Sequence, residues 1–385
     1  MSAWPGKYVI GLTGNIATGK SVVRKMLEHL GAFGIDADGI SHQAMAKGGP
    51  AYAGVVKAFG EFVVGDDGQI DRAALGNIVF SNPKALAKLE AVVHPVVRQG
   101  VQILTTRASQ KVIVIEAIKL LEGDLAGLCD SIWVVNAPEA AQAARLIQKR
   151  HLTPDQARAR IAAQNAQADK LKKANIVIQN AGAFEETWAH VQAAWNKLVG
   201  APQPEKEAAA PTLAAEPKPG AASTITVRKG KPSDAASIAA FITTATHKAR
   251  QLTRADIMEA FGQKAFVLAQ VNDGLGALAG WQVENLVTRV DDFYFLHVQP
   301  TAVLRQMLDS IESASRDLQS EAAFLFVAPS LQSGAAPAFT TAGYETIDAN
   351  TISITAWREA VKEYQPAGSV VLFKKLREDR VLRPV

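Results

Sequence analysis

A short segment near the N-terminus has the residue types and spacing that bind a chain of phosphates, and it reads Gly14-Asn15-Ile16-Ala17-Thr18-Gly19-Lys20-Ser21. It fits G-x-x-x-x-G-K-[ST], follows a short apolar run and precedes a helical pattern at 21–30. The backbone N–H groups of such a loop and the helix dipole favour negative charge. Lys20 can reach the β- and γ-phosphate oxygens, and Ser21 can place its hydroxyl on Mg²⁺. The context predicts a nucleotide site, in preference to a glycine-rich turn that only caps a helix.

Two aspartates follow the first helical pattern, within Gly34-Ile35-Asp36-Ala37-Asp38. We expect this segment to end the second strand, where side chains at i and i+2 point the same way. At the carboxyl end of a parallel strand both would face the ligand crevice. One can then accept a proton from an attacking hydroxyl while the other helps to hold Mg²⁺ or substrate. The alternative, that both are cap and turn residues for a helix starting at Ile40, is equally open.

Glu116 ends the apolar run at 112–115. An acid in this position orders Mg²⁺ through water in P-loop enzymes, although an ordinary strand-end carboxylate has the same sequence context. Further apolar runs lie at 132–135 and 176–178, and longer helical stretches separate them. Such runs are typical of strands buried on both faces. The first part of the chain is therefore predicted to be α/β, a P-loop NTPase-type parallel sheet with helices on both sides.

The composition of the chain predicts two domains and indicates which kind of partner it binds. Residues 200–223 are rich in Pro, Ala and Gly, which predicts a flexible linker between domains at 1–199 and 224–385. The net charge of +4 over 385 residues suits an anionic small molecule and gives no nucleic-acid signature. No signal peptide and no membrane span are predicted, and the single Cys129 fits a small apolar filler in a cytoplasmic protein.

Basic side chains concentrate in residues 139–173, namely Arg145, Lys149, Arg150, Arg158, Arg160, Lys170, Lys172 and Lys173. A cationic helical lid can stabilise charge on a transferring phosphoryl group and exclude water. A solvated basic face on an exposed helix pair has the same composition.

Several separate motifs, in one order, make residues 8–198 similar to the dephospho-CoA kinase family. They are Gly11-Leu12-Thr13-Gly14, Gly19-Lys20-Ser21, Asp36-Ala37-Asp38, Asp71-Arg72-Ala73-Ala74-Leu75, Val79-Phe80, Leu89-Glu90, His94-Pro95, Gln142, Arg145, Arg150, Gln164 and Ile178-Gln179-Asn180. The resemblance implies ATP-dependent phosphorylation of the ribose 3′-hydroxyl of dephospho-CoA, with Mg²⁺ as cofactor.

The same resemblance assigns roles to matching positions. It implies that Asp38 is the base for the ribose hydroxyl, with Lys20 and Ser21 serving ATP and Mg²⁺. Arg145 and Arg150 would reach the phosphates from a helical lid. Further residues follow from matching motifs: Asn180 on the nucleotide side, Glu116 with Ser21 at the metal, and Asp36, Arg72 and His94 near the acceptor.

The sequence departs from the family pattern at three places. Asn15 and Ala17 stand where glycines are usual; Asn tolerates positive φ, so the loop is expected to keep its form. In the segment 116–122, Ile118 replaces a proline and Lys119 enters an apolar position, which either alters the acceptor pocket or adds a phosphate contact. Asn175 replaces an aspartate near the expected adenine side.

The second domain is similar to the GNAT-type acyltransferase fold, an α+β domain. Its predicted strands lie at 225–229, 266–271, 276–283, 292–298 and 323–328, with a hairpin turn at 272–274. An active member needs a glycine-rich loop that holds the CoA pyrophosphate, and residues 299–305 contain no glycine. We therefore expect a non-catalytic domain, with CoA or an acyl-CoA as a possible ligand.

Two other functions remain open for the first domain. One is a different small P-loop kinase for a nucleoside, nucleotide or sugar. The other is a regulatory protein that binds ATP without turnover, which the altered segment 116–122 would allow. A GTPase is disfavoured because the sequence has no N-K-x-D motif.

Overall fold

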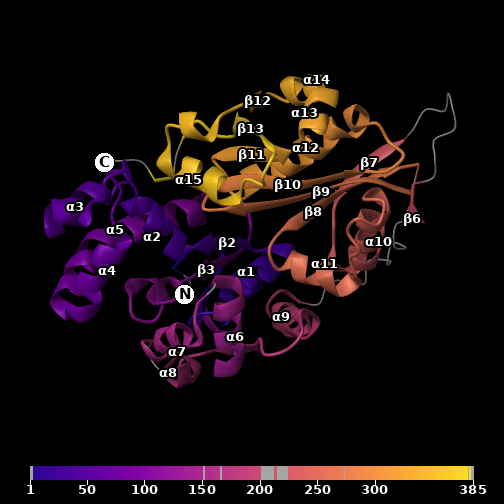
Figure 1. Ribbon diagram of the computed structural model, residues 1–385. Helices are drawn as coiled ribbons and strands as arrows, with labels where there is room; N and C mark the ends of the chain where they lie inside the picture. Colours follow the sequence, from indigo (N-terminus) through magenta and orange to yellow (C-terminus); the bar gives the residue numbers. More distant parts are fainter. Residues whose placement is uncertain are drawn as a thin grey trace.

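A computed structural model describes residues 3–150, 152–164, 167–200, 212–214, 224–272, 274–379 and 381–382. It contains two β-sheets, each covered by helices on both faces (Figure 1). No helix in these ranges has the length and apolar character that a membrane crossing needs. Of the predicted linker, residues 201–211 and 215–223 lie outside the described residues, so the domain boundaries stay a prediction.

The first half alternates strands and helices, as the sequence predicts. Its elements are β1 (Tyr8–Thr13), α1 (Lys20–His29), β2 (Phe33–Asp36), α2 (Ala37–Met45), α3 (Tyr52–Phe59), η1 (Glu61–Val63), α4 (Arg72–Ser81), α5 (Pro83–Arg107), β3 (Val112–Glu116), η2 (Asp124–Leu128), β4 (Ser131–Asn136), α6 (Glu139–Arg150), α7 (Pro154–Ala162), α8 (Gln167–Lys172), β5 (Ile176–Gln179) and α9 (Phe184–Val199). The strands form a parallel sheet in the order β2-β3-β1-β4-β5. One face packs against α1 and α9, and the other packs against α2 and α5.

The strand register brings the predicted site residues to one edge of this sheet. Leu12 and Asp36 both lie opposite Glu116, on either side of β3. The phosphate-binding loop leaves β1 directly after Thr13. Because parallel strands end together, the loop and the acids meet in the crevice beyond their carboxyl ends.

The second half confirms the predicted α+β class. Its elements are β6 (Thr212–Leu213), β7 (Ile225–Lys229), η3 (Pro232–Asp234), α10 (Ala235–Ala245), α11 (Arg254–Phe261), β8 (Ala265–Val271), β9 (Gly274–Glu284), β10 (Val287–Phe295), α12 (Pro300–Asp317), β11 (Ala322–Val327), α13 (Pro329–Gly334), α14 (Ala336–Thr341), β12 (Glu345–Thr346), η4 (Ala349–Thr351), α15 (Thr355–Tyr364) and β13 (Val370–Lys375). The sheet runs β12-β13-β11-β10-β9-β8-β7, with β10 and β11 parallel around α12. This is the element order expected from the resemblance to the GNAT-type fold.

One sequence prediction for the second half needs correction, and some elements there were not predicted. The strand expected at 292–298 is β10, and it begins five residues earlier, at Val287. The helix α15 and the strand β13 were not predicted. The predicted hairpin turn at 272–274 includes Asp273, which lies outside the described residues.

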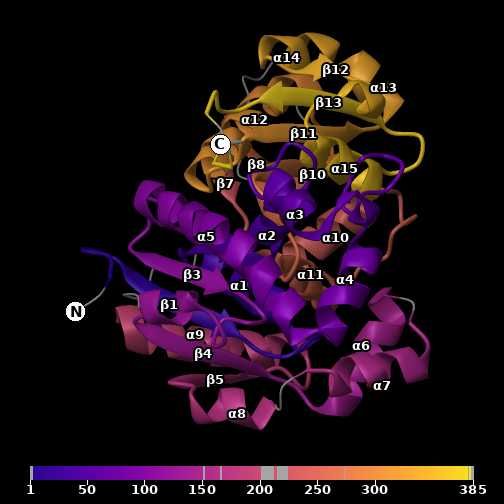
Figure 2. The same cartoon turned by 90° about the vertical axis from the view of Figure 1, so that its left-hand side faces the viewer.

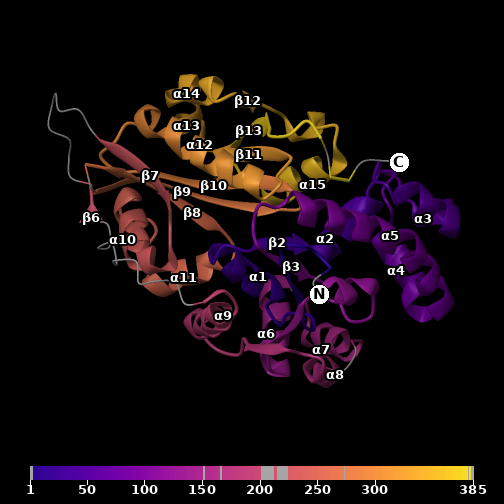
Figure 3. The same cartoon turned by 180° about the vertical axis from the view of Figure 1, so that it is seen from behind.

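The two halves share a hydrophobic core. Leu286, Val381 and Leu382 of the second half are buried in the core that α2 and α5 form with the first sheet. Figures 1 and 3 show α2 and β2 on the side of the first half that faces β9 and β10. Figure 2 shows from a second side that the C-terminal sheet stacks over α2. The end of the chain thus returns to the helix that carries Asp38.

Candidate active site

The phosphate-binding loop keeps its form with one strained residue. The loop keeps the form that the sequence predicts, but Ala17, with φ of 57°, and not Asn15, adopts the left-handed conformation. Gly19, the N-cap of α1, has φ of 93°, and a Cβ there would lie 2.0 Å from Asn180 Nδ2. The Thr18 hydroxyl donates to Asn15 O at 2.9 Å and closes the loop. These contacts fix the form of the loop.

Lys20 points back over this loop rather than into solvent. It is 7% exposed, and its Nζ donates to Asn15 O at 3.2 Å. Burial lowers the pKa of Lys20, while Glu116, Asp38 and Asp36 oppose that shift. A cation held at low dielectric beside the loop amides attracts phosphate oxygens more strongly than it would in water.

Glu116 forms the acidic side of the crevice. The Ser21 hydroxyl donates to Glu116 Oε1 at 2.8 Å, and Arg24 Nε donates to Glu116 Oε2 at 2.8 Å. Oxygen donors of this kind suit Mg²⁺, which usually takes one or two protein ligands and completes its shell with phosphates and water. No cluster of three or more His, Cys, Asp or Glu side chains in the described ranges could hold a metal by itself. The donors therefore fit Mg²⁺ that is bound together with a nucleotide.

Asp36 and Asp38 lie near each other, but not as the sequence predicts. The strand ends at Asp36, whose Oδ1 accepts the N–H of Gly39 at 2.8 Å and caps α2. Asp38 belongs to the first turn of α2, so the two carboxylates do not share one strand face. The cap interpretation is thus correct for Asp36, and a helix presents Asp38.

Asp38 has the environment of a proton acceptor. Its Oδ2 accepts the N–H of Ile118 at 3.0 Å. Burial raises the pKa of Asp38 to about 6, with Asp36 and Glu116 adding to the shift and Lys20 opposing it. A base with a pKa closer to neutrality is better matched to proton transfer than an ordinary aspartate.

Asp38 also lines a hollow of about 720 Å³ between α2 and α5. His94 lines the same hollow, as the resemblance implies for the acceptor side. Lys119, which departs from the family pattern, lines it too and pairs with Glu90 at 3.2 Å. Arg72 lines an adjacent hollow, also of about 720 Å³, which α15 of the second half borders through Glu359, Lys362 and Glu363. His94, Lys119 and Arg72 are thus distributed over two neighbouring hollows, whereas Asp36 lines a separate small cavity.

Arg145 and Asn180 hold the outer side of the loop. The Arg145 guanidinium donates to Ala17 O at 3.1 Å, to Thr18 O at 3.3 Å and to Asn180 O at 2.8 Å. Asn180 Nδ2 donates to Thr18 O at 2.7 Å. Arg150, at the end of α6, is near enough to help lower the pKa of Lys20. In this state Arg145 is engaged with backbone oxygens.

Three lid residues at the site were not predicted as site residues. Gln164 Oε1 accepts the N–H of Ile16 at 2.7 Å, and Gln167 Oε1 accepts the N–H of Asn15 at 3.0 Å. Lys170, 4% exposed, donates to Ile118 O at 2.7 Å, and burial lowers its pKa. The sequence placed Lys170 in the basic lid, but only the folded lid brings it to the segment that binds Asp38.

Two other residues have structural surroundings. Asn175 Oδ1 accepts the N–H of Ile132 at 2.7 Å and joins the start of β5 to β4. Cys129 donates to Leu125 O at 3.2 Å, and burial raises its thiol pKa to about 12. A protonated, half-buried thiol fits the predicted filler role.

Comparison with known proteins places the first half in a family. The family profile of dephospho-CoA kinases matches residues 8–186. The dephospho-CoA kinase of Moorella thermoacetica is 40% identical over 195 residues, which are 50% of this chain and 92% of that protein. The crystal structure of TT1252 from Thermus thermophilus is 32% identical and covers 50% of this chain and 98% of its own, with a TM-score of 0.46. A putative acetyltransferase from Salmonella typhimurium with acetyl-CoA is 11% identical, covers 40% of this chain and 95% of its own, and has a TM-score of 0.31.

The match to the Moorella protein includes nearly the whole of that relative at high identity. This chain therefore belongs to the dephospho-CoA kinase family, and it is a kinase that makes coenzyme A from dephospho-CoA and ATP.

Proposed function

We propose that Asp38 is the general base that activates the ribose 3′-hydroxyl of dephospho-CoA for in-line attack on the γ-phosphorus of ATP. The observation that supports this most is the position of Asp38, which lines the acceptor hollow and interacts electrostatically with Lys20 of the phosphate-binding loop. The Ile118 N–H fixes one carboxylate oxygen and leaves the other for the hydroxyl proton. As the new O–P bond forms and the bond to ADP breaks, the hydroxyl proton passes to Asp38.

The residues around the loop bind and orient ATP. Lys20 and the N–H groups of residues 14–21 contact the β- and γ-phosphates, where charge grows as the phosphoryl group moves. Gln164 and Gln167 now accept two of these N–H groups, so phosphate oxygens would replace their amide oxygens. Arg145 and Arg150 supply positive charge from the lid.

Ser21 and Glu116 would hold Mg²⁺, which when bound supplies charge neutralisation between the β- and γ-phosphates. Arg24 and Ser21 both donate to Glu116 and orient its carboxylate for this role. Arg24 in turn pairs with Glu28, so the carboxylate keeps its orientation.

On the acceptor side, Arg72, His94 and Lys119 line the two hollows and would contact dephospho-CoA. Asp36 lines the separate small cavity beside Glu284, so its predicted contact with the acceptor has no support from these hollows. His94 and Lys119 share a wall with Asp38, and Arg72 lies beside His42 farther along α2.

The test is a coupled assay of ADP release with dephospho-CoA, adenosine and shikimate as acceptors. Turnover with dephospho-CoA alone, reduced at least about 100-fold in Asp38→Asn, is the expected result. Turnover of another acceptor would contradict the acceptor assignment. Full activity of Asp38→Asn would contradict the base.

For the second half we propose a non-catalytic role. The helix that would hold a CoA pyrophosphate, α12, starts with Pro300, which has no N–H, and its N-cap Gln299 makes no side-chain cap bond. If CoA or acetyl-CoA binds there, calorimetric titration of the full chain should give two sites per chain for CoA. A stoichiometry of one site per chain would mean that CoA binds to the kinase half alone.

A further inference from the structure

The hairpin between β9 and β10 ends in an unusual turn. Glu284 and Val287 form its last pair, so only Asn285 and Leu286 make the turn. Both have positive φ, 50° and 63°. Two-residue hairpin turns of this kind favour Asn-Gly, because a side chain is costly in the left-handed region. A leucine in the glycine position needs a compensating contact.

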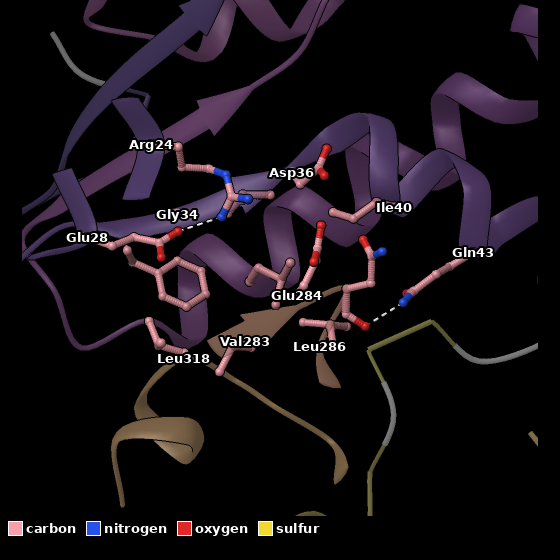
Figure 4. A pocket seen from close by; sticks show the side chains of 14 residues that line it. Arg24, Glu28, Gly34, Asp36, Ile40, Gln43, Val283, Glu284, Leu286 and Leu318 are labelled. Carbon is pink, nitrogen blue, oxygen red and sulfur yellow. Dashed lines mark hydrogen bonds and ion pairs between the residues drawn. The ribbon is translucent and has the colours of Figure 1, made fainter. Parts of the chain in front are cut away.

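That contact lies in the other half of the molecule. Leu286 is only 9% exposed and packs in the core of the first half. Leu286, Ile40 of α2 and Leu318 all line a cavity of about 40 Å³. Figure 4 shows Leu286 on the hairpin side of this cavity and Ile40 on the side of α2. The strained residue is thus an anchor between the halves, since backbone strain persists where the surroundings stabilise it.

Polar contacts fix the same hairpin tip against α2 and α1. Gln43 Nε2 donates to the backbone oxygen of Asn285, and Lys25 Nζ donates to Val283 O at 2.9 Å. The Asn285 side chain lies against Gly39, where an added Cβ would be 2.1 Å from its Oδ1. Gly39 directly follows Asp38 and donates its N–H to the Asp36 cap. The tip therefore contacts the first turn of α2, which presents the base.

The C-terminal residues hold α2 from a second direction. Leu382 is 5% exposed and packs with Ile40 against Gly100 of α5. Asp379 pairs with Arg107 at the end of α5 at 2.7 Å. The second half thus contacts α2 through both the hairpin tip and the chain end.

We propose that the β9–β10 hairpin tip is a positioning element for Asp38, so that the GNAT-like half completes the kinase active site. Leu286 is the positioning residue: it fixes the depth and rotation of α2, and thereby the carboxylate relative to the acceptor hydroxyl. The proposal rests on Asp38 being the base.

The first test is Leu286→Gly in the full chain. Glycine suits the turn better than leucine, so the hairpin should form while its anchor is lost. We expect kcat to fall at least about tenfold, because a small displacement of a catalytic group is costly. The KM values for ATP and dephospho-CoA should stay within about threefold, since the change affects the transition state more than binding. Leu286→Met should keep kcat within about twofold.

A matched control replaces another left-handed residue of the second half. His247 has φ of 49° and is exposed, so His247→Gly relieves similar strain without removing an anchor. Its kcat should equal that of the unmodified chain. If Leu286→Gly lowers the melting temperature but leaves kcat unchanged, the second half only stabilises the first, and the proposal is wrong.

The second test combines Leu286→Gly with Asp38→Asn. If the hairpin acts through Asp38, the double variant should have the residual kcat of Asp38→Asn within about twofold, because coupled residues are not additive. If the kcat reductions of the two single variants multiply in the double variant, the proposal is wrong. If Asp38→Asn alone leaves kcat unchanged, Asp38 is not the base, and the proposed function fails. The single variant therefore distinguishes failure of the proposed function from failure of the positioning proposal.

Discussion

At the scale of single residues, Asp38 combines burial with access to the acceptor hollow. The carboxylate must be ionised to accept a proton, and burial raises its pKa to about 6. We therefore expect kcat/KM for dephospho-CoA to rise with pH and level off above about 7, because the free enzyme must lose the Asp38 proton. Initial rates measured from pH 5 to 8.5 test this rise of kcat/KM with pH. A flat profile over this range would contradict the role of Asp38.

The same pKa predicts an effect on stability. The folded protein binds the Asp38 proton more tightly than the unfolded chain, so ionising it destabilises the fold as pH rises from about 4 through 6. Asp38→Asn removes this cost and can still accept the N–H of Ile118. We expect the free energy of unfolding of the variant to rise by about 2 kcal/mol at pH 8 and by less at pH 4.5. Urea denaturation at both pH values checks this, and equal effects at both would contradict it.

Ala17 gives a second test at this scale, since it holds a positive φ in the phosphate-binding loop. Ala17→Gly should remove strain of about 1 kcal/mol and leave ATP turnover intact. Ala17→Val should increase the strain and raise the KM for ATP, because a β-branched residue is a stronger outlier there. Thermal melts and ATP titrations of both variants measure the difference. Equal behaviour of the two would show that the loop does not need this conformation.

At the scale of elements, Arg145 joins the lid to the loop. Two nitrogens of its planar guanidinium donate to carbonyl oxygens of the loop and of Asn180. The single ammonium group of a lysine cannot reproduce this geometry. We expect Arg145→Lys to lower kcat/KM for ATP about tenfold or more, although charge is retained. Arg158 is an exposed lid residue that pairs with Asp155, and Arg158→Lys serves as the control. A normal kcat/KM in Arg145→Lys would mean that only the charge matters.

The sequence predicted those elements whose signals are local. The loop at 14–21 was predicted because strand, glycines and helix occur in one continuous segment. Asp38 was placed on a strand because nothing local shows that Asp36 ends β2 by capping α2. The start of β10 was missed because its turn, Asn285-Leu286, contains no glycine. Lys170 was missed as a site residue because its contact with Ile118 depends on how the lid folds.

At the scale of the whole molecule, the two halves form one packed unit around α2. Contacts such as Leu382 with Ile40 join residues far apart in the chain, so composition and periodicity could not reveal them. We expect Leu382→Ala to destabilise the chain by about 2 kcal/mol or more through the cavity it leaves. Scanning calorimetry of this variant should show that the unfolding transition of the kinase half also moves to lower temperature. Leu213→Ala, which is 37% exposed, is the control and should change little.

The central claim is phosphoryl transfer to the ribose 3′-hydroxyl, and the position of the new phosphate tests it most directly. The full chain would be incubated with ATP, Mg²⁺ and dephospho-CoA, and the product examined by ¹H–³¹P correlation NMR. The account predicts a new phosphomonoester coupled to the ribose 3′ proton, which Asp38→Asn forms far more slowly. Coupling to the 2′ proton, or ADP release without a new ester, would contradict it.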